Sequence, residues 1–300
     1  MSVSPSASPM ISEPHFIFHF GSLEYDLSSR THLMGVLNVT ADSFSDGGKY
    51  LDADAALRRG LELVEQGADF IDVGGESTRP GSNSLPVEEE IRRVIPVIEQ
   101  LAKRTTVPVS VDTYKSPVAN AALHAGAAIV NDISGLTFDS MMGETVARHD
   151  GALVIMHMKG TPKTMQENPT YEDVVSEVYQ FLRQQREAAR QFGIRQIMID
   201  PGIGFGKKLE HNIEIIKKLW GLKSLECPIL VGPSRKSFIG MILDLPVTDR
   251  LEGTAAAVTA CILNGAHIVR VHDVKEMKRV ARVTDALKPL QSISTVAQFG

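Results

Sequence analysis

Eight short apolar runs, each followed by a longer segment of mixed polarity, constrain the fold of this 300-residue chain more than any other feature. The runs do not alternate between apolar and polar residues, which is typical of strands covered on both faces, as in parallel sheets. They fall at residues 33–37, 70–73, 109–111, 128–130, 153–156, 197–199, 229–231 and 268–271.

The segments between the runs have helical spacing, as at Leu209, Ile213, Ile216 and Trp220, and predict amphipathic helices packed on a sheet. Ser234 is expected to begin one of them, ahead of residues 235–243. Eight strand–helix repeats favour an α/β fold that is a single (β/α)8 TIM barrel. An open doubly wound sheet is the alternative, because strand order is not visible in sequence.

The two ends of the chain lie outside this repeat. Residues 1–14 are rich in Ser and Pro without periodicity and predict a disordered tail. Residues 15–20 and 23–27 flank a Gly-Ser pair and predict an N-terminal β-hairpin ahead of the first buried strand. We therefore expect one barrel domain over residues 15–290 and a C-terminal tail over 291–300.

Charge and composition exclude several classes of protein. The 31 Lys and Arg against 36 Asp and Glu give a net charge of -5 without a basic cluster, so no nucleic-acid partner is expected. The chain has no apolar run of about 18 residues and no secretory signal, so we expect no membrane partner and a cytoplasmic location. Two cysteines, Cys227 and Cys261, cannot form a disulfide framework or a structural zinc site.

Polar side chains end three of the predicted strands, where the active site of a barrel is built. Asp112, Asn131 and Asp200 are therefore expected at one mouth. Their carboxylates can bind a metal, act as a general base or accept from paired N–H groups of a heterocycle, while the amide of Asn131 suits a planar ring edge. Asp132 is more simply explained as a cap for the helix that follows it.

Basic residues at other strand ends predict a cationic rim, despite the negative net charge. Arg79 follows the second strand, and Arg270 and His272 share one direction at the end of the eighth. Residues 202–207 read Gly-Ile-Gly-Phe-Gly-Lys, which lacks both Walker and Rossmann spacing, so a nucleotide fold is not supported. A third interpretation, that Lys236 forms a Schiff base with a substrate, is less favoured because its neighbours are charged and polar.

These segments resemble the dihydropteroate synthases of folate biosynthesis. Residues 34–48 and 71–81 resemble two signatures of that family, and later strand ends continue its order at 110–113, 131–133, 156–158, 200–207, 234–237 and 270–273. One departure is Ala41, where the family usually has proline. We expect it to loosen the first loop with less effect on the chemistry.

The resemblance implies a transferase that joins 6-hydroxymethyl-7,8-dihydropterin pyrophosphate to 4-aminobenzoate. The products are 7,8-dihydropteroate and pyrophosphate, formed through a cationic pterin intermediate. Magnesium is the implied cofactor, the two substrates are the implied small-molecule partners, and a homodimer is the implied assembly.

The resemblance also assigns residues to sites. The pterin site takes Asp112, Asn131, Met156, Asp200 and Lys236. The pyrophosphate site takes Asn38, Thr78, Arg79, Arg270 and His272, with Asn38 as the protein ligand of magnesium. The aminobenzoate site takes Thr78, Pro80, Phe205, Lys236 and Ser237. The catalytic set is Asp112, Lys236, Arg270 and His272, and no general base is assigned.

Two rival functions remain open at this point. A methyltetrahydrofolate:corrinoid methyltransferase shares the pterin carboxylates and amide but needs no pyrophosphate site, so Arg79, Arg270 and His272 disfavour it. A non-catalytic pterin-binding paralogue is supported only by Ala41. Release of pyrophosphate in the presence of both substrates would separate the alternatives.

Overall fold

An eight-stranded parallel sheet forms the centre of the structure, a computed structural model that describes residues 15–39, 49–78 and 81–288. Every predicted apolar run is a strand of this sheet. The strands are β3 (His32–Asn38), β4 (Phe70–Gly74), β5 (Val109–Asp112), β6 (Ile129–Asp132), β7 (Ala152–Met156), β8 (Ile197–Asp200), β9 (Leu230–Val231) and β10 (Ile268–Val271).

The sheet closes on itself. Its order is β8-β7-β6-β5-β4-β3-β10-β9, and a parallel bridge between Ile199 and Ile229 joins the two outer strands. The Ile199 amide also donates to the Pro228 carbonyl at 3.0 Å. The predicted barrel is confirmed, and the open sheet is excluded.

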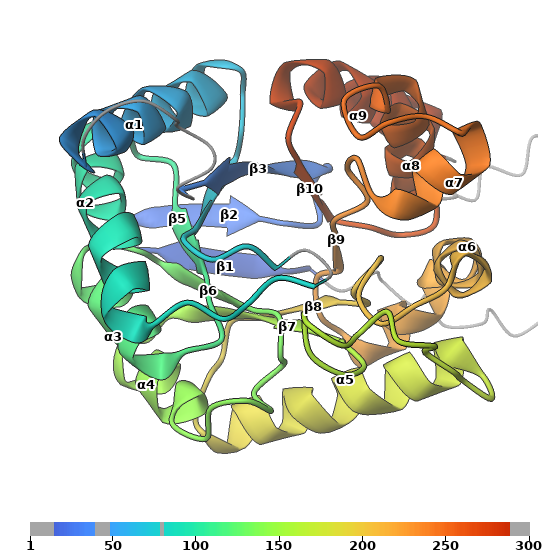
Figure 1. Cartoon of the computed structure of the whole chain (residues 1–300), viewed down its shortest axis with the longest axis horizontal. Helices are drawn as coiled ribbons and strands as arrows, with labels where there is room; N and C mark the ends of the chain where they lie inside the picture. The colour runs from blue at the N-terminus through green and yellow to red at the C-terminus, as the bar shows by residue number, and fades with distance from the viewer. Residues whose placement is uncertain (1–14, 40–48, 79–80, 289–300) are drawn as a thin grey trace, which may run out of the picture.

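Helices surround the barrel in a ring (Figure 1). They are α1 (Lys49–Glu65), α2 (Val87–Arg104), α3 (Ser116–His124), α4 (Met142–Arg148), α5 (Val174–Gln191), α6 (Leu209–Lys217), α7 (Ser237–Leu243), α8 (Leu251–Leu263) and α9 (Val274–Leu287), with a 3-10 helix at Leu219–Leu225. The principal hydrophobic core lies between this ring and the outer faces of the strands. This double cover explains why the strands are not alternating in sequence.

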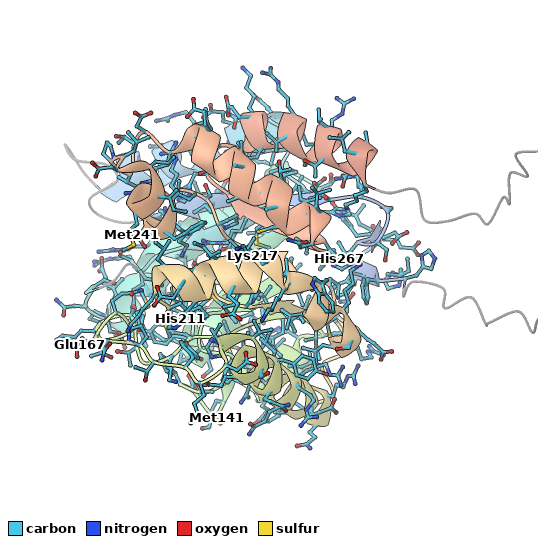
Figure 2. All side chains as sticks on the ribbon, turned by 90° about the vertical axis from the view of Figure 1, so that its right-hand side faces the viewer. Met141, Glu167, His211, Lys217, Met241 and His267 are labelled. Atoms are coloured by element: carbon cyan, nitrogen blue, oxygen red, sulfur yellow. The ribbon has the colours of Figure 1, made fainter. Side chains whose placement is uncertain are left out.

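The predicted hairpin is confirmed as β1 (Ile17–Phe20) and β2 (Leu23–Asp26), and it lies across the amino end of the barrel. Phe16, Phe18 and Phe20 pack with inward-facing residues near the amino ends of the barrel strands. Phe16 also meets the ring of His267 edge-on at 5.1 Å. Figure 2 shows His267 toward one end of the molecule and Met241 of α7 toward the other. The amino end is therefore closed by apolar packing.

One helix begins later than the sequence predicts. Helix α7 starts at Ser237, two residues later than the predicted start at residue 235, because Arg235 has a left-handed backbone with φ of 58° that cannot continue a helix. The loop before α7 is consequently longer and places Lys236 at the N-cap position.

Alternate residues of each strand point into the barrel, and their chemistry changes along its axis. Phe70, Ile129 and Ile268 belong to the apolar cluster at the hairpin end. Two residues further on, β4 carries Asp72, β6 carries Asn131 and β10 carries Arg270. The interior therefore turns from apolar to polar within one layer of side chains.

Some predictions fall on residues that the structure does not describe: the two tails (1–14 and 291–300), Ala41, Arg79 and Pro80. Within residues 15–39, 49–78 and 81–288, no helix combines the length and the apolar character needed to cross a membrane.

Candidate active site

The carboxyl end of the barrel brings together the three strand-end residues that the sequence predicts. Asp112, Asn131 and Asp200 are 9%, 4% and 5% exposed and line one cavity with Lys236 and Arg270. The three side chains come from β5, β6 and β8, whose carboxyl ends meet at this edge. The structure therefore supports a shared polar mouth.

Asp72 is a site residue that sequence reasoning missed. Its Oδ2 accepts from Asn131 Nδ2 at 3.0 Å and from Arg270 Nε at 2.6 Å. The bond from Asn131 Nδ2 orients that amide and leaves its oxygen available to a ligand. The signal that was available is a carboxylate inside an apolar strand, because an unpaired charge is rarely buried there.

The cavity floor has carboxylate oxygens without partners. Within the described residues, Asp72 Oδ1 and Asp112 Oδ1 are buried and accept no hydrogen bond. Leaving such an acceptor unsatisfied costs about 1 to 3 kcal/mol. A ligand with suitably placed N–H donors would recover that cost at Asp112, which lines the cavity.

Burial changes the protonation of both cavity carboxyls. Removal from water raises the pKa of Asp112 to about 7, against the opposing attraction of Arg270, because one guanidinium faces two carboxylates. Removal from water also raises the pKa of Asp200 to about 6, although the Gly202 amide donates to its Oδ1 at 2.7 Å. Both groups therefore titrate close to neutral pH.

Lys236 forms the wall opposite the carboxyls. Its Nζ lies 3.9 Å from the centre of the Phe205 ring. Burial and the nearby charge of Arg270 lower the pKa of Lys236 to about 8, so the ammonium form still predominates at pH 7. Its charged and polar neighbours in the sequence do not keep the amine fully hydrated. The Schiff-base role is still disfavoured, because the protonated amine is a hydrogen-bond donor and a poor nucleophile.

Arg270 lies deeper than a rim residue. Its Nη2 donates to Asp112 Oδ2 at 2.7 Å, in addition to its contact with Asp72. Arg270 and Lys236 both line the cavity, whose empty volume is about 330 Å³.

His272 is not part of a cationic rim, contrary to the interpretation of the sequence. Burial, followed by the charges of Arg270 and Arg235, lowers the pKa of His272 to about 4. Its Nδ1 lies 3.0 Å from Ser234 Oγ, which also accepts from the backbone amide of His272. The Ser234 hydroxyl can donate to Nδ1 or accept from it, and Nε2 is the ring nitrogen that this contact leaves available.

The left-handed conformation of Arg235 is held by its surroundings. Its guanidinium makes a bidentate pair with Asp273, at 2.9 Å and 2.5 Å. Arg250 Nη1 donates to the carbonyls of Arg235 and Lys236. Arg235 is thus neutralised and fixes the backbone of Lys236, so it does not serve as a free cation at the mouth.

Apolar side chains cover one side of the cavity. Met156, Ile133 and Phe205 form a small buried cluster with Met165. Three of them, Met156, Ile133 and Phe205, line the same cavity as Asp112. A flat ring bound to the carboxyls would contact this cluster, in agreement with the pterin role predicted for Met156.

Asp132 has a structural role, but it is not the helix cap predicted from the sequence, because α4 begins only at Met142. Its carboxylate accepts from Ser134 and from the Leu136 amide, at 2.7 to 2.8 Å. It therefore shapes the turn after β6 instead of facing the cavity.

The loop after β4 carries the predicted Thr78, which is half-buried. Lys115 anchors this loop: its Nζ donates to Glu76, to Glu90 and to the Leu85 carbonyl at 2.5 to 2.6 Å. Arg79 and Pro80 follow directly and are not among the described residues. Asn38, at the end of β3, is exposed.

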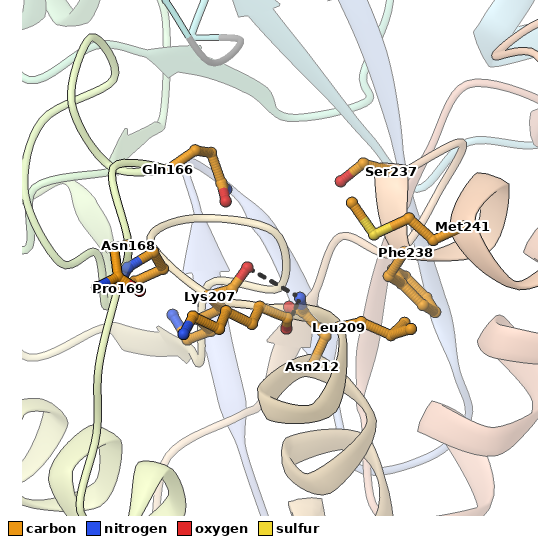
Figure 3. Close-up of a pocket in the computed structure, with 10 residues that line it drawn as sticks. Gln166, Asn168, Pro169, Lys207, Leu209, Asn212, Ser237, Phe238 and Met241 are labelled. Carbon is orange, nitrogen blue, oxygen red and sulfur yellow. Dashed lines mark hydrogen bonds between the residues drawn. The ribbon is translucent and has the colours of Figure 1, made fainter.

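A second cavity lies beside the first, between the loop after β7, α6 and α7 (Figure 3). Its lining includes Ser237, Phe238 and Met241 of α7 and Gln166 of that loop. The predicted aminobenzoate residues are therefore divided, because Phe205 and Lys236 line the first cavity and Ser237 lines the second.

Comparison with known proteins identifies the family. A family model described as pterin binding enzyme matches residues 34–272. The chain is 46% identical over 270 residues to the dihydropteroate synthase of Synechocystis sp., covering 89% of this chain and 93% of that protein. It is 45% identical over 260 residues to the Escherichia coli dihydropteroate synthase, covering 86% and 92%.

A crystal structure of Xanthomonas albilineans dihydropteroate synthase with 4-aminobenzoic acid superposes with a TM-score of 0.86 at 41% identity, covering 92% of this chain and 99% of that chain. Fold, cavity residues and sequence relatives agree, and the chain belongs to the dihydropteroate synthase family of pterin-binding enzymes.

Proposed function

We propose that this protein is a dihydropteroate synthase. The C–O bond between the pterin methylene and the pyrophosphate breaks, and the electron pair leaves with pyrophosphate. The aminobenzoate nitrogen then attacks the cationic methylene carbon and loses a proton to give 7,8-dihydropteroate. Structures of relatives that hold 4-aminobenzoic acid and 7,8-dihydropteroate support these substrates and this product.

The pterin is held by hydrogen bonds in the first cavity. Asp112 and Asp200 accept from its N–H groups, the Asn131 amide oxygen accepts from another, and the Lys236 ammonium donates to a ring acceptor. Met156 packs against the ring. The single observation that carries the proposal is this cavity, in which two buried carboxyls, an oriented amide and a buried ammonium converge.

The pyrophosphate is held at the outer edge. His272 donates from Nε2, and Arg270 releases part of its contact with Asp112 to bind the leaving group. Thr78 and Arg79 contribute from the loop after β4. The donors stabilise the negative charge that develops as the C–O bond breaks, so catalysis is electrostatic and needs no general base in its first step.

The proposed magnesium ion would be held mainly by the pyrophosphate of the substrate, with Asn38 as a protein ligand. No group of three acidic, His or Cys residues that could hold a metal occurs among the described residues. Asn38 offers one amide oxygen, and a Cβ on Gly74 would come within 3.9 Å of it and 3.6 Å of Asp112 Oδ2, so glycine keeps this space open. Magnesium commonly takes most of its ligands from phosphates and water, and it would neutralise the leaving group there.

The aminobenzoate ring is placed against Phe205 and Lys236, whose contact builds a wall beside the pterin. By the family resemblance, Thr78 and Pro80 would also contact the ring, and Ser237 would bind the carboxylate. The arylamine is a competent nucleophile in its neutral form, so the protein has only to position it.

The test is steady-state release of pyrophosphate in the presence of both substrates. We expect release that depends on aminobenzoate and on magnesium, and that falls about a thousandfold in Arg270→Ala, as for loss of a transition-state charge donor. A non-catalytic pterin-binding protein would bind the pterin without releasing pyrophosphate. A methyltransferase would not distinguish pterin pyrophosphate from the free pterin alcohol.

A homodimer and a cytoplasmic location are further parts of the proposal. Met241, Ile242 and Leu243 of α7 are 66%, 57% and 43% exposed, which is an unusual apolar surface for a single chain. The small residues of α8 give no additional support, because Gly253 packs against Ile239 of the same chain. Sedimentation of the wild-type chain and of Ile242→Glu tests this surface, and the variant should be monomeric.

A further inference from the structure

Lys207 ends the glycine-rich segment 202–207, and it is buried without a carboxylate partner. Its side chain is 2% exposed. Its Nζ lies 2.9 Å from His157 Nδ1, 2.9 Å from the Gly202 carbonyl and 3.0 Å from the Phe205 carbonyl. The His157 carbonyl is a fourth acceptor, at 3.3 Å. Among the described residues Lys207 forms no ion pair, and burial lowers its pKa to about 7, so these acceptors hold an amino group that has no carboxylate beside it.

His157 presents its ring nitrogen as an acceptor. The ring lies at the carboxyl end of β7, edge-on to Phe181 at 5.0 Å. Burial and the Lys207 charge lower the pKa of His157 to about 2, so the imidazole is neutral and Nδ1 can accept from Lys207. The Met-His-Met sequence at this strand end thereby has a role that its residue types did not indicate.

The loop that Lys207 holds is tightly folded against this strand end. Gly202, Gly204 and Gly206 all have left-handed φ values, of 70°, 84° and 62°. A Cβ on Gly202 would lie 1.9 Å from the His157 carbonyl. The glycines therefore allow a close backbone approach, and no phosphate is needed to explain them.

Other contacts of this loop come from outside it. Asn212 of α6 accepts from the Gly204 amide at 2.7 Å, and Gln166 donates to the Gly204 carbonyl at 3.0 Å. Figure 3 shows Asn212 beside Lys207, whose carbonyl accepts from Asn212 Nδ2. These contacts fix the middle and the end of the loop. The Phe205 amide donates to the Gly202 carbonyl at 3.1 Å, and Lys207 Nζ contacts the carbonyls of both residues.

Both joined residues serve the first cavity. The Gly202 amide donates to Asp200, and the Phe205 ring lies under Lys236. Asp200 is also held by the pairing of β8 with β7, in which it lies opposite Met156. Phe205 lies outside the strands, and the hydrogen bonds that hold its backbone are the one from its amide to the Gly202 carbonyl and the one from Lys207 Nζ to its own carbonyl.

We infer that Lys207 is a positioning residue that sets the aminobenzoate side of the active site by holding Phe205 beneath Lys236. Its ammonium touches neither substrate. Without it, the Phe205 carbonyl loses its buried donor, the Gly202 carbonyl keeps the Phe205 amide, and the Phe205 end of the loop moves. This inference rests on the proposed function, because it names which substrate the loop positions.

The test compares Lys207→Met, which keeps the length of the side chain without its charge, with Lys208→Met at the neighbouring lysine. We expect the KM for aminobenzoate to rise about tenfold or more in Lys207→Met. The KM for pterin pyrophosphate should change by less than about threefold, and Lys208→Met should behave like the wild type. Unchanged KM values, or an equal rise for both substrates, would overturn the inference.

A second pair of variants covers poor folding of Lys207→Met. His157→Asn keeps a side-chain acceptor near the position of Nδ1, and His157→Leu removes it. We expect His157→Asn to retain the aminobenzoate KM and His157→Leu to raise it selectively. Equal behaviour of the two variants would contradict the role of the lysine contact. If the wild-type enzyme itself releases no pyrophosphate, the proposed function is wrong, which is a separate outcome.

Discussion

The two ends of the barrel are built from the same strands but differ in the side chains that fill their interiors, which are mostly apolar at the amino end and polar at the carboxyl end. At the amino end, Phe70 of β4 packs edge-on against Phe20 of the hairpin at 5.8 Å and belongs to a wholly apolar cluster. Two residues along the same strand, Asp72 has a buried oxygen without a partner. The closed end supplies stability, and the open end keeps polar groups free for a ligand at a cost in stability.

Phe70→Ala should produce the largest change in stability. The side chain is fully buried, and its removal leaves a cavity under the hairpin, so we expect a loss of about 3 to 5 kcal/mol in the free energy of unfolding. Urea denaturation measures this, with Phe70→Leu as the milder control. Pterin affinity measured by calorimetry should be unchanged, and a large loss of affinity would show that the two ends are coupled.

Asp112→Asn and Asp200→Asn should weaken pterin binding without a loss of stability, which is the reverse of the result expected for Phe70→Ala. Each replaces an acceptor for a pterin N–H, so we expect pterin binding to weaken roughly 5- to 150-fold for each variant. The free energy of unfolding should not fall, because each variant removes a buried carboxyl that resists ionisation. Unchanged pterin affinity in both variants would remove these residues from the site.

The carboxyl end should also make the stability of the protein depend on pH, because Asp112 titrates near neutral pH. The folded-state pKa of Asp112, about 7, lies above its ordinary value of 3.8. Folding therefore favours the protonated form of Asp112. The stability that this preference adds is complete below about pH 4 and is lost as the pH rises through 7. We expect wild-type stability to decline relative to Asp112→Asn over this range, as measured by urea denaturation at a series of pH values. A constant difference would contradict the raised pKa.

The smallest effect is expected at the edge of the hairpin. The Gln196 side chain accepts from the His19 amide and donates to its carbonyl at 3.1 Å. Both contacts are exposed, so Gln196→Ala should cost about 0.5 to 1.5 kcal/mol of stability and leave turnover unchanged. Arg195→Ala, which removes an exposed ion pair with Asp150, is the control and should cost less. A change in turnover would link the hairpin to catalysis.

Much of the site was visible in the sequence, because it lies where strands end. The positions of Asp112, Asn131 and Asp200 after apolar runs place them at the mouth, the family resemblance adds Lys236, and the structure groups all four around one cavity. The resemblance to a family added substrates, which residue types alone left open. Asp72 was missed, because within its strand it looked like part of a buried run.

The sequence by itself determined the number and order of the strands, the helices between them and the hairpin, because these depend on the periodicity of neighbouring residues. Tertiary structure alone decided which side chains are paired. Asp72 and Arg270 meet across 198 positions of the chain, and Lys207 meets His157 across 50. Such contacts, and the pKa values that burial gives to Asp112 and His272, arise only when the barrel closes and removes water from its mouth.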